Sequence, residues 1–276
     1  MPELPEVEVI CRGLRPHLLG QQITAISQSG KQLRYPVPFD LMQREMLNRV
    51  IIDIQRRAKY IQFFLDNGAM LILHLGMTGN LGIFPQSMPP ARHDHLFWSL
   101  ANGEELRYHD VRRFGFLVML SKREVSSRDT IVFQNCGPEP LSQEFHGDYL
   151  HARAKGKQIP VKSFLMDNRN VVGIGNIYAN ESLFHAGIRP AKKVSRITKR
   201  QWHRLADSVR AVLTEAIHCG GSTISDFRNA SQQRVYFQIN FKVYGRTGEK
   251  CLNCQATIQS RKIGGRASFY CPHCQL

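Results

Sequence analysis

Apolar residues near the start of the chain recur at spacings of three and four from Val7 to Leu18. This spacing places them on one face of a helix. Pro5 suits the first helical position, because proline has no backbone N–H to leave unpaired there, and Gly20 is a helix-ending residue. We therefore expect one amphipathic helix from Pro5 to just before Gly20.

The pattern then changes to short apolar segments separated by turn residues. Asn67–Gly68 and Asn102–Gly103 are dipeptides typical of tight hairpin turns, and each lies between two such segments. Several short strands joined by hairpins favour an antiparallel sandwich or barrel. The expected strands are residues 50–54, 60–65, 69–75, 95–100, 105–108 and 114–120.

From about residue 135 the pattern changes again, and apolar residues recur at helical spacing. Residues 137–140, with one glycine and two prolines, form the expected linker. The change predicts an α+β chain in which a mostly β half precedes a helical half. The length of 276 residues fits two domains and a small metal module. Helices are expected at residues 162–166, 175–186, 199–218 and 222–229.

Two pairs of cysteines near the end of the chain have the spacing of a zinc site. Two residues separate the cysteines within each pair, and 16 residues separate the pairs. Four thiolates in this pattern close a tetrahedral structural zinc site, and we expect a β-hairpin between the pairs. Disulfides are not expected, because the sequence has no signal peptide or long apolar run. The expected ligands are Cys251, Cys254, Cys271 and Cys274, and the expected small buried hydrophobes are Cys11, Cys136 and Cys219.

Positive charge is concentrated in the last third of the chain. The formal net charge is +15, of which residues 187–276, with 16 basic and 4 acidic residues, carry +12. A basic region joined to a nearly neutral one indicates a surface that binds a polyanion. Nucleic acid is favoured over a membrane because no basic amphipathic helix with a wide apolar face is evident. We expect this binding to weaken steeply as the salt concentration rises.

The first residues offer a reactive amine. Removal of Met1 would leave Pro2 as the terminal residue, and an α-amino group with a pKa of roughly 7.7–8 is partly neutral near pH 7. Such a secondary amine can form a cationic iminium with a carbonyl-like carbon. Glu3 and Glu6 lie nearby as candidate proton donors or acceptors. The alternative interpretation is that Pro2 and Pro5 only stiffen the chain before a helix.

Seven motifs, in a fixed order, carry a resemblance to a known enzyme family. They are PELPEVE at residues 2–8, RRAKY at 56–60, HLGMTG at 74–79, DVRRFG at 110–115, GNIYANE at 175–181, VYGR at 243–246 and the four-cysteine motif. With these motifs the chain resembles the bacterial formamidopyrimidine-DNA glycosylases over essentially its whole length. Their sister branch is endonuclease VIII.

The resemblance implies three domains. The first, at residues 1–134, is a catalytic antiparallel β-sandwich with an N-terminal helix. The second, at residues 135–240, is a helical DNA-binding domain with a helix-two-turns-helix motif. The third, at residues 241–276, is a zinc-finger β-hairpin.

The family removes oxidised bases from duplex DNA in base excision repair, and it flips the damaged nucleotide out of the stack to reach its sugar. The resemblance implies that Pro2 attacks C1′ and releases the base. The iminium would then allow β,δ-elimination, so that the strand is cut on both sides of the sugar. Glu3 matches the proton-transfer residue that helps to open the sugar ring, and Glu6 matches a residue near the flipped base. The implied activities are glycosylase and AP lyase, and the implied substrates are formamidopyrimidines and 8-oxoguanine.

Four further residues match positions that grip phosphates around the extruded nucleotide in the family: Lys59, His74, Asn176 and Arg266. We group Lys59 and Arg266 with the catalytic residues, and His74, Asn176 and Glu6 with the residues that bind DNA. Taken singly, the two cations would be solvated surface charges. His74 would be a core or turn histidine, and Asn176 would be a helix N-cap.

Met77, Arg112 and Phe114 match the trio that fills the space left by the flipped nucleotide. The two apolar side chains would occupy the hole, and the arginine would hydrogen-bond the orphaned partner base. Taken singly, Met77 and Phe114 would be core residues. The set fits the formamidopyrimidine branch better than the endonuclease VIII branch.

One loop departs from the family. Relatives that prefer 8-oxoguanine usually carry two glycines in the segment that corresponds to residues 229–235, and Gln232 and Val235 replace them here. Glycine permits positive φ and a close approach of the backbone to a ligand. We therefore expect the chemistry to be retained and the lesion preference to be altered, toward ring-opened purines or oxidised pyrimidines. Ala58, where the family often has glycine, is a smaller departure.

Three alternatives remain open. A DNA-binding protein without activity would also use the basic region and the zinc module, but it has no need for a terminal amine. A pyrimidine-specific enzyme is favoured by the glycine-free loop and disfavoured by the Met-Arg-Phe trio. An RNA enzyme is disfavoured because no aromatic-rich single-strand platform is evident.

We expect one structural zinc ion and damaged double-stranded DNA as the partner. No small-molecule cofactor and no membrane association are expected. We also expect a monomer in the bacterial cytoplasm, associated with the nucleoid through its DNA binding.

Overall fold

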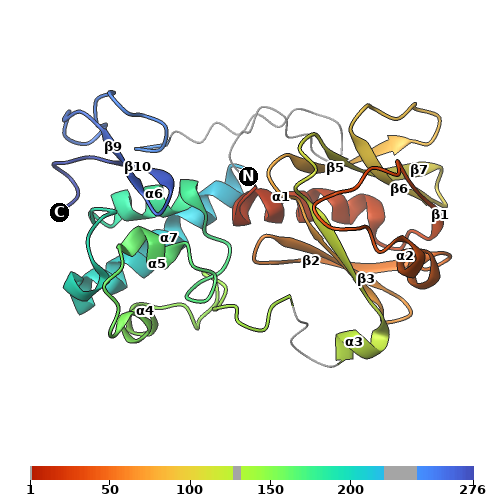
Figure 1. Cartoon of the computed structure of the whole chain (residues 1–276), viewed down its shortest axis with the longest axis horizontal. Coiled ribbons are helices and arrows are strands. Elements are labelled where there is room, and N and C mark those ends of the chain that lie inside the picture. The colour runs from red at the N-terminus through yellow and green to blue at the C-terminus, as the bar shows by residue number, and fades with distance from the viewer. Residues whose placement is uncertain (1, 127–131, 221–240) are drawn as a thin grey trace. The chain divides into compact units, whose positions relative to one another are not determined.

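The computed structural model describes residues 2–126, 132–220 and 241–276, which belong to two compact units (Figure 1). The N-terminal unit contains the chain up to Gln134, and the C-terminal unit contains Asn135–Cys219 and Gln238–Leu276. The helix predicted at residues 222–229 and the glycine-free loop at 229–235 lie outside the described residues. The division into three domains stays a prediction.

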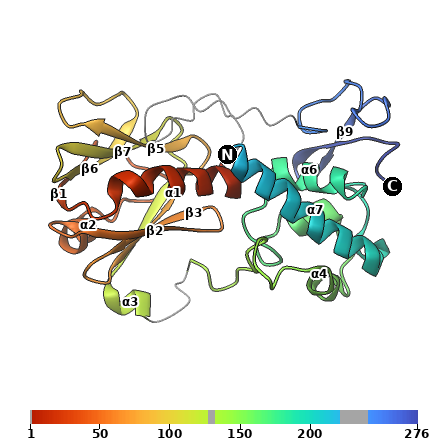
Figure 2. The same ribbon diagram turned by 180° about the vertical axis from the view of Figure 1, so that it is seen from behind.

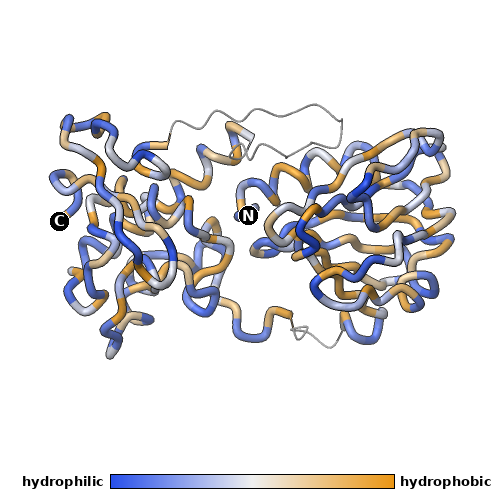
Figure 3. The backbone as a smooth tube through the Cα atoms, turned by 45° about the horizontal axis from the view of Figure 1, so that its top comes forward, coloured by the Kyte–Doolittle hydropathy of each residue, from blue (hydrophilic) through white to orange (hydrophobic). Residues whose placement is uncertain are grey.

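Two four-stranded antiparallel sheets form the described part of the N-terminal unit, with strand orders β1-β6-β7-β5 and β2-β3-β4-β8. The predicted sandwich is thereby confirmed, and its strands carry many apolar residues (Figure 3). Burial alternates along β3, whereas β4 is buried over four consecutive residues. Two strands, β1 and β5, were not predicted. The strands are β1 Ile23–Gln28, β2 Ile51–Arg57, β3 Tyr60–Leu65, β4 Met70–His74, β5 Gly79–Pro85, β6 Asp94–Leu100, β7 Glu104–Asp110 and β8 Phe116–Leu120.

Helix α1 (Leu4–Leu18) joins the sandwich through its apolar face and contacts β2 and β3 (Figure 2). Its predicted position is confirmed, with the difference that Leu4 is the first helical residue and Pro5 the second. Arg15 Nε donates a hydrogen bond to the Ile54 carbonyl at 2.7 Å, so α1 is also tied to β2 by a polar contact. Two shorter helices, α2 (Phe39–Met46) and α3 (Lys122–Ser126), complete the described elements of this unit.

The core of the N-terminal unit combines side chains from both sheets and from α1. Val7 and Leu14 of the helix belong to the same buried cluster as Trp98 and Tyr108 of the sheets. Burying each large apolar side chain contributes about 1.5–3 kcal/mol. This shared core holds the beginning of α1 in place, and with it the first residues of the chain.

The C-terminal unit is built around α7 (Lys199–His218), which matches the predicted helix. Thr198 and Gln201 form a reciprocal capping box at its start, and α4 and α6 pack against it. The expected hairpin between the cysteine pairs is present as β9 and β10, which pair antiparallel. The remaining elements are α4 Gly147–Ala154, α5 Val161–Leu165, α6 Asn176–His185, the 3₁₀ turn Val194–Arg196, β9 Gln259–Ile263 and β10 Arg266–Tyr270.

Among the described residues, no helix is both long enough and apolar enough to cross a bilayer.

Candidate functional site

The beginning of α1 holds two buried acids beside Pro2. Glu3 is the N-cap, and its backbone N–H donates to Glu6 Oε2 at 2.8 Å while the Glu6 backbone N–H donates to the Glu3 side chain. The two residues are 2% and 3% exposed. The positive end of a helix dipole stabilises carboxylates at this position. A terminal amine on Pro2 would therefore lie directly before a carboxylate held in a fixed orientation.

The turn that carries Lys59 is tied to the same helix. Arg56 Nε donates to Glu8 Oε2 at 3.0 Å, and Arg56 Nη1 donates to the Ala58 carbonyl at 3.1 Å. Ala58 adopts φ +53°, a conformation that a residue with a Cβ adopts only at some cost. Burial alone would raise the pKa of Glu8, but hydrogen bonds from Arg12 and Arg56 and the charges of both arginines outweigh it and lower the pKa. The salt bridge therefore fixes the Lys59 turn relative to α1.

His74 lies on β4, the strand next to this turn. Tyr60, next to Lys59, pairs with His74 in the register of β3 and β4, and the Tyr60 and His74 rings are 4.9 Å apart. The Phe116 ring stacks on His74 at 5.1 Å between centroids, and it also contacts the Tyr60 ring edge-on at 6.0 Å, so the three rings form one cluster.

Burial and the nearby charges of Lys59 and Arg34 lower the pKa of His74 to about 4. The imidazole is therefore neutral near pH 7. Its Nδ1 accepts the Gly76 N–H at 3.1 Å, which assigns the proton to Nε2. His74 thus offers an uncharged N–H donor at neutral pH, and protonation is not needed for that role.

Met77 and Phe114 are not core residues, so that alternative is wrong. Their exposed fractions are 37% and 41%, so neither side chain is covered by the core. The Arg112 guanidinium lies 4.6 Å from the centre of the Phe114 ring. The hollow beside Arg112 and Phe114 has a volume of about 650 Å³, and its other lining residues are Gln32, Leu33, Arg34 and Arg113.

Asp110 organises the two loops that carry this trio, and the sequence reasoning gave it no role. The residue is fully buried. One carboxylate oxygen accepts from Thr78 Oγ1 at 2.6 Å and from the Arg112 N–H at 3.3 Å. The other accepts from Tyr108 Oη at 3.0 Å and from the Gly115 N–H at 2.9 Å. The buried carboxylate thus replaces water with four protein donors.

Two glycines allow the loops to approach this closely. A Cβ on Gly76, which adopts φ +66°, would lie 2.4 Å from the Phe114 carbonyl carbon. A Cβ on Gly115 would lie 1.7 Å from Tyr108 Oη. A series of direct contacts therefore runs from α1 through the Lys59 turn and His74 to the loops of Met77, Arg112 and Phe114.

In the C-terminal unit, Asn176 is the first residue of α6. Gly175 is the N-cap, so the alternative that Asn176 caps the helix is wrong. Asn176 Oδ1 is buried and finds no hydrogen-bond partner within the described part of the chain. The first backbone N–H groups of a helix form a natural anion-binding site.

Arg266 is an exposed residue at the first position of β10. Its strand is held against α5 and α6 by two side chains. The buried Lys162 donates to the Ala267 carbonyl at 2.8 Å and to Ser268 Oγ at 2.7 Å, and Asn180 Oδ1 accepts the Phe269 N–H at 2.9 Å. Arg266 and the start of α6 therefore share one rigid framework within this unit.

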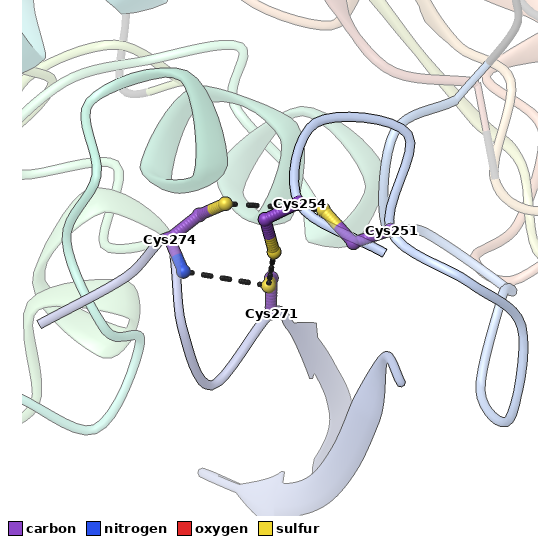
Figure 4. A group of neighbouring side chains, drawn as sticks. All are labelled: Cys251, Cys254, Cys271 and Cys274. Carbon is purple, nitrogen blue, oxygen red and sulfur yellow. Dashed lines mark hydrogen bonds between the residues drawn. The ribbon is translucent and has the colours of Figure 1, made fainter. Parts of the chain in front are cut away.

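The four predicted zinc ligands converge on a common centre (Figure 4). Their sulfur atoms all lie within 4.8 Å of one another, with 3.4 Å between Cys254 and Cys271 and 3.9 Å between Cys251 and Cys274. Ligands at about 2.3 Å in a tetrahedron place sulfurs about 3.8 Å apart. The cluster is a closed site for one structural zinc ion.

Of the three other cysteines, one is buried as expected and two are not. Cys11 is buried, and burial raises its pKa to about 12. Cys136 is only partly buried and Cys219 is exposed, so the prediction of three buried hydrophobes is wrong for these two. Cys219 follows the last residue of α7, where the helix ends and its apolar face no longer continues.

Comparison with known proteins finds family models that match three stretches of the chain. Residues 1–117 match the formamidopyrimidine-DNA glycosylase N-terminal domain, residues 136–228 the H2TH domain of that enzyme, and residues 248–276 the zinc finger found in FPG and IleRS.

Curated relatives cover the whole chain. The formamidopyrimidine-DNA glycosylases of Photobacterium profundum and Vibrio atlanticus are 46% and 44% identical and match over 100% of both chains. A crystal structure of a Lactococcus lactis FPG mutant in complex with Fapy-dG-containing DNA covers 99% of both chains, with a TM-score of 0.89 and 34% identity. The chain belongs to the formamidopyrimidine-DNA glycosylase family, as its motifs predicted.

Proposed function

We propose that the protein is a bifunctional DNA glycosylase and AP lyase of base excision repair. It removes oxidised bases, formamidopyrimidines and 8-oxoguanine, from duplex DNA and then cuts the strand. The observation that carries this proposal is the arrangement at the start of α1, where Glu3 and Glu6 are buried and hydrogen-bonded to each other's backbone directly after Pro2.

The reaction begins with the neutral amine of Pro2. Its lone pair attacks C1′, the bond from C1′ to the base breaks, and the departing base takes a proton from water. Glu3 accepts the proton that the Pro2 nitrogen loses and passes it to the ring oxygen as the sugar opens, so that an iminium joins Pro2 to C1′. Loss of a proton from C2′ expels the 3′ phosphate, and a second elimination expels the 5′ phosphate.

The remaining site residues bind and orient the nucleotide. Lys59 supplies a cation and His74 an uncharged donor for phosphates on the surface of the N-terminal unit, where the charge of Lys59 already acts on His74. Asn176 at a helix start and the exposed Arg266 supply donors in the C-terminal unit. Met77 and Phe114 fill the space of the flipped nucleotide, and Arg112 bonds the orphaned base.

The partner is damaged double-stranded DNA, which the +15 net charge favours. The solved relatives from Lactococcus lactis include complexes with abasic-site DNA and with Fapy-dG DNA. The protein acts as a monomer in the bacterial cytoplasm, with the zinc ion as its one cofactor.

A second candidate function is preferential removal of oxidised pyrimidines. The glycine-free segment 229–235 favours it, and one Lactococcus lactis FPG structure holds oxidised pyrimidine-containing DNA. The exposed Met77, Arg112 and Phe114 set favours the purine lesions.

Borohydride trapping followed by peptide mass spectrometry tests the chemistry. We expect a covalent adduct on Pro2 with a duplex that carries an abasic site. A matched protein with a short extension before Pro2 should bind the same duplex and form no adduct. Failure of the untagged protein to form an adduct, with Met1 removed and DNA binding intact, would identify a damage-binding protein without activity.

Single-turnover cleavage of matched duplexes ranks the lesions. The duplexes carry 8-oxoguanine, a formamidopyrimidine or an oxidised pyrimidine in one sequence. Because the loop lacks both glycines, we expect 8-oxoguanine not to be the best substrate. A wide margin in favour of 8-oxoguanine opposite cytosine would contradict the altered preference.

A further inference from the structure

Thr78 connects the two loops that carry the exposed trio. Its hydroxyl donates to Asp110 Oδ1 at 2.6 Å and accepts the Arg112 backbone N–H at 3.0 Å. The hydroxyl therefore donates to the buried carboxylate and accepts from the residue expected to contact the orphaned base.

The sheet places Thr78 at this point. Gly79, the first residue of β5, pairs with Asp110, the last residue of β7. Thr78 thus lies directly beyond the end of the ladder, where regular backbone pairing stops and the two chains diverge into their loops. Beyond the last backbone pair, the Arg112 N–H donates to the Thr78 hydroxyl, where a strand would offer a backbone carbonyl.

The bond to Asp110 is of the strong, charge-assisted kind, since it joins an O–H group to a carboxylate at short distance. It holds the hydroxyl in the rotamer that presents its lone pair to Arg112. The backbone position of Arg112 in turn sets where its guanidinium lies, which is over the Phe114 ring. Thr78 therefore fixes Arg112 without itself belonging to the exposed trio.

We propose that Thr78 is a positioning residue that sets the selectivity of the enzyme for the base opposite the lesion, through Arg112. This inference rests on the proposed function, in which Arg112 contacts the orphaned base. The Thr78 hydroxyl takes no part in the Pro2 chemistry in this scheme, because both of its hydrogen bonds are made to Asp110 and Arg112. Its loss should relax base selectivity and leave the covalent step intact.

The test compares Thr78→Val, which keeps the shape and removes the hydroxyl, with Thr78→Ser, which keeps the hydroxyl. Single-turnover cleavage is measured on duplexes with the lesion that wild type cleaves fastest, placed opposite each of the four bases. One good arginine–base contact discriminates by roughly tenfold or more. We expect Thr78→Val to lose about tenfold in selectivity and Thr78→Ser to retain that of wild type.

Arg112→Ala supplies the second arm. If Thr78 acts through Arg112, adding Thr78→Val to Arg112→Ala should lower selectivity no further, which is the non-additivity expected of coupled residues. An additional loss in the double variant would overturn the proposal. Unchanged selectivity in Thr78→Val, the same loss in Thr78→Ser, or a wild type without selectivity would also overturn it.

Borohydride trapping on an abasic duplex separates this proposal from the proposed function. Thr78→Val should trap at the wild-type rate, because the hydroxyl takes no part in iminium formation. A parallel fall in trapping and selectivity would indicate a general structural role and overturn the proposal. Absence of trapping with wild type would instead refute the proposed function. If Thr78→Val fails to fold, Thr78→Ala with the same Arg112→Ala cycle replaces it.

Discussion

The loops around Asp110 and the loops around the four zinc-binding cysteines both hold exposed side chains in place, but they do so with different chemistry. In the N-terminal unit, the buried carboxylate accepts from four protein donors, two from side chains and two from the backbone. In the C-terminal unit, the four sulfurs lie within 4.8 Å of one another. Deprotonated thiolates at that spacing repel one another unless a cation lies between them.

This difference indicates which of the two regions can fold without a bound metal ion. Asp110 is satisfied by groups that fold with it, so the loops of Met77, Arg112 and Phe114 need no further component. The zinc-binding region that carries the β9–β10 hairpin and Arg266 has only a small core, which it shares with Phe184 of α6 and in which Cys251 and Cys271 are themselves members. We therefore expect its order to depend on zinc.

Removal of zinc should produce the largest effect. Structural zinc supplies about 10–16 kcal/mol of apparent binding free energy in zinc-finger peptides, and that free energy is coupled to folding. Chelation, or the substitution Cys254→Ser, should abolish protection of β9 and β10 in hydrogen exchange and leave β6 and β7 protected. DNA cleavage should fall by about 100-fold or more, because Arg266 loses its framework.

Cys219→Ser is the matched control for this experiment. Cys219 is exposed and lies outside the cluster, so its substitution should change neither zinc content nor hydrogen exchange. Equal loss of protection in both units after chelation would show that the comparison drawn between them is wrong.

The substitution Asp110→Asn should disrupt the hydrogen bonds that hold the loops around Asp110. The substitution keeps the shape but turns one acceptor into an NH₂ group that faces existing donors. Loss of hydrogen bonds to a buried charge and the unpaired groups left behind should lower the free energy of unfolding by about 3 kcal/mol. Urea denaturation of the N-terminal unit measures it, with the exposed Asp66→Asn as the control. A change below about 0.5 kcal/mol, the usual size for surface substitutions, would contradict the role given to Asp110.

The two centres also differ in how far the sequence could predict them. The zinc ligands lie in two local pairs whose spacing is itself the signal, so all four were found before the structure. Three of the four donors to Asp110 lie within five positions of it, but Thr78 is 32 positions away, and no local pattern pairs Thr78 with Asp110. Their meeting depends on the register between β5 and β7, which only the folded chain defines.

The predicted elements follow the same rule. The helix α7 was predicted at its observed bounds because its apolar spacing is a local signal. Strand β5 was missed because Gly79 and Gly82 interrupt its apolar run, and glycine weakens the signal of a strand. Strand β1 was missed because only Ile23 and Ile26 among its six residues are buried.

Lowering the pH should have a smaller effect, which destabilises the N-terminal unit through His74. Its pKa is lowered from 6.5 to about 4 in the folded protein, chiefly by burial. Between these values the unfolded chain binds the proton and the folded protein does not. The contribution of His74 to the free energy of unfolding is therefore fully present above about pH 6.5, decreases as the pH falls, and is lost below about pH 4. At pH 5 the loss relative to pH 7 is about 2 kcal/mol.

Tryptophan fluorescence can measure this loss in the N-terminal unit alone. The chain has two tryptophans, Trp98 in the N-terminal unit and Trp202 in the C-terminal unit, so Trp202→Phe leaves Trp98 as the reporter. His74→Gln in this background should flatten the dependence of unfolding on pH between 7 and 5, because the titrating group is gone. Zinc release in acid affects both proteins alike and cancels in the comparison. Parallel pH profiles for the two would show that the pKa of His74 is not lowered on folding, and would contradict the effect of burial on it.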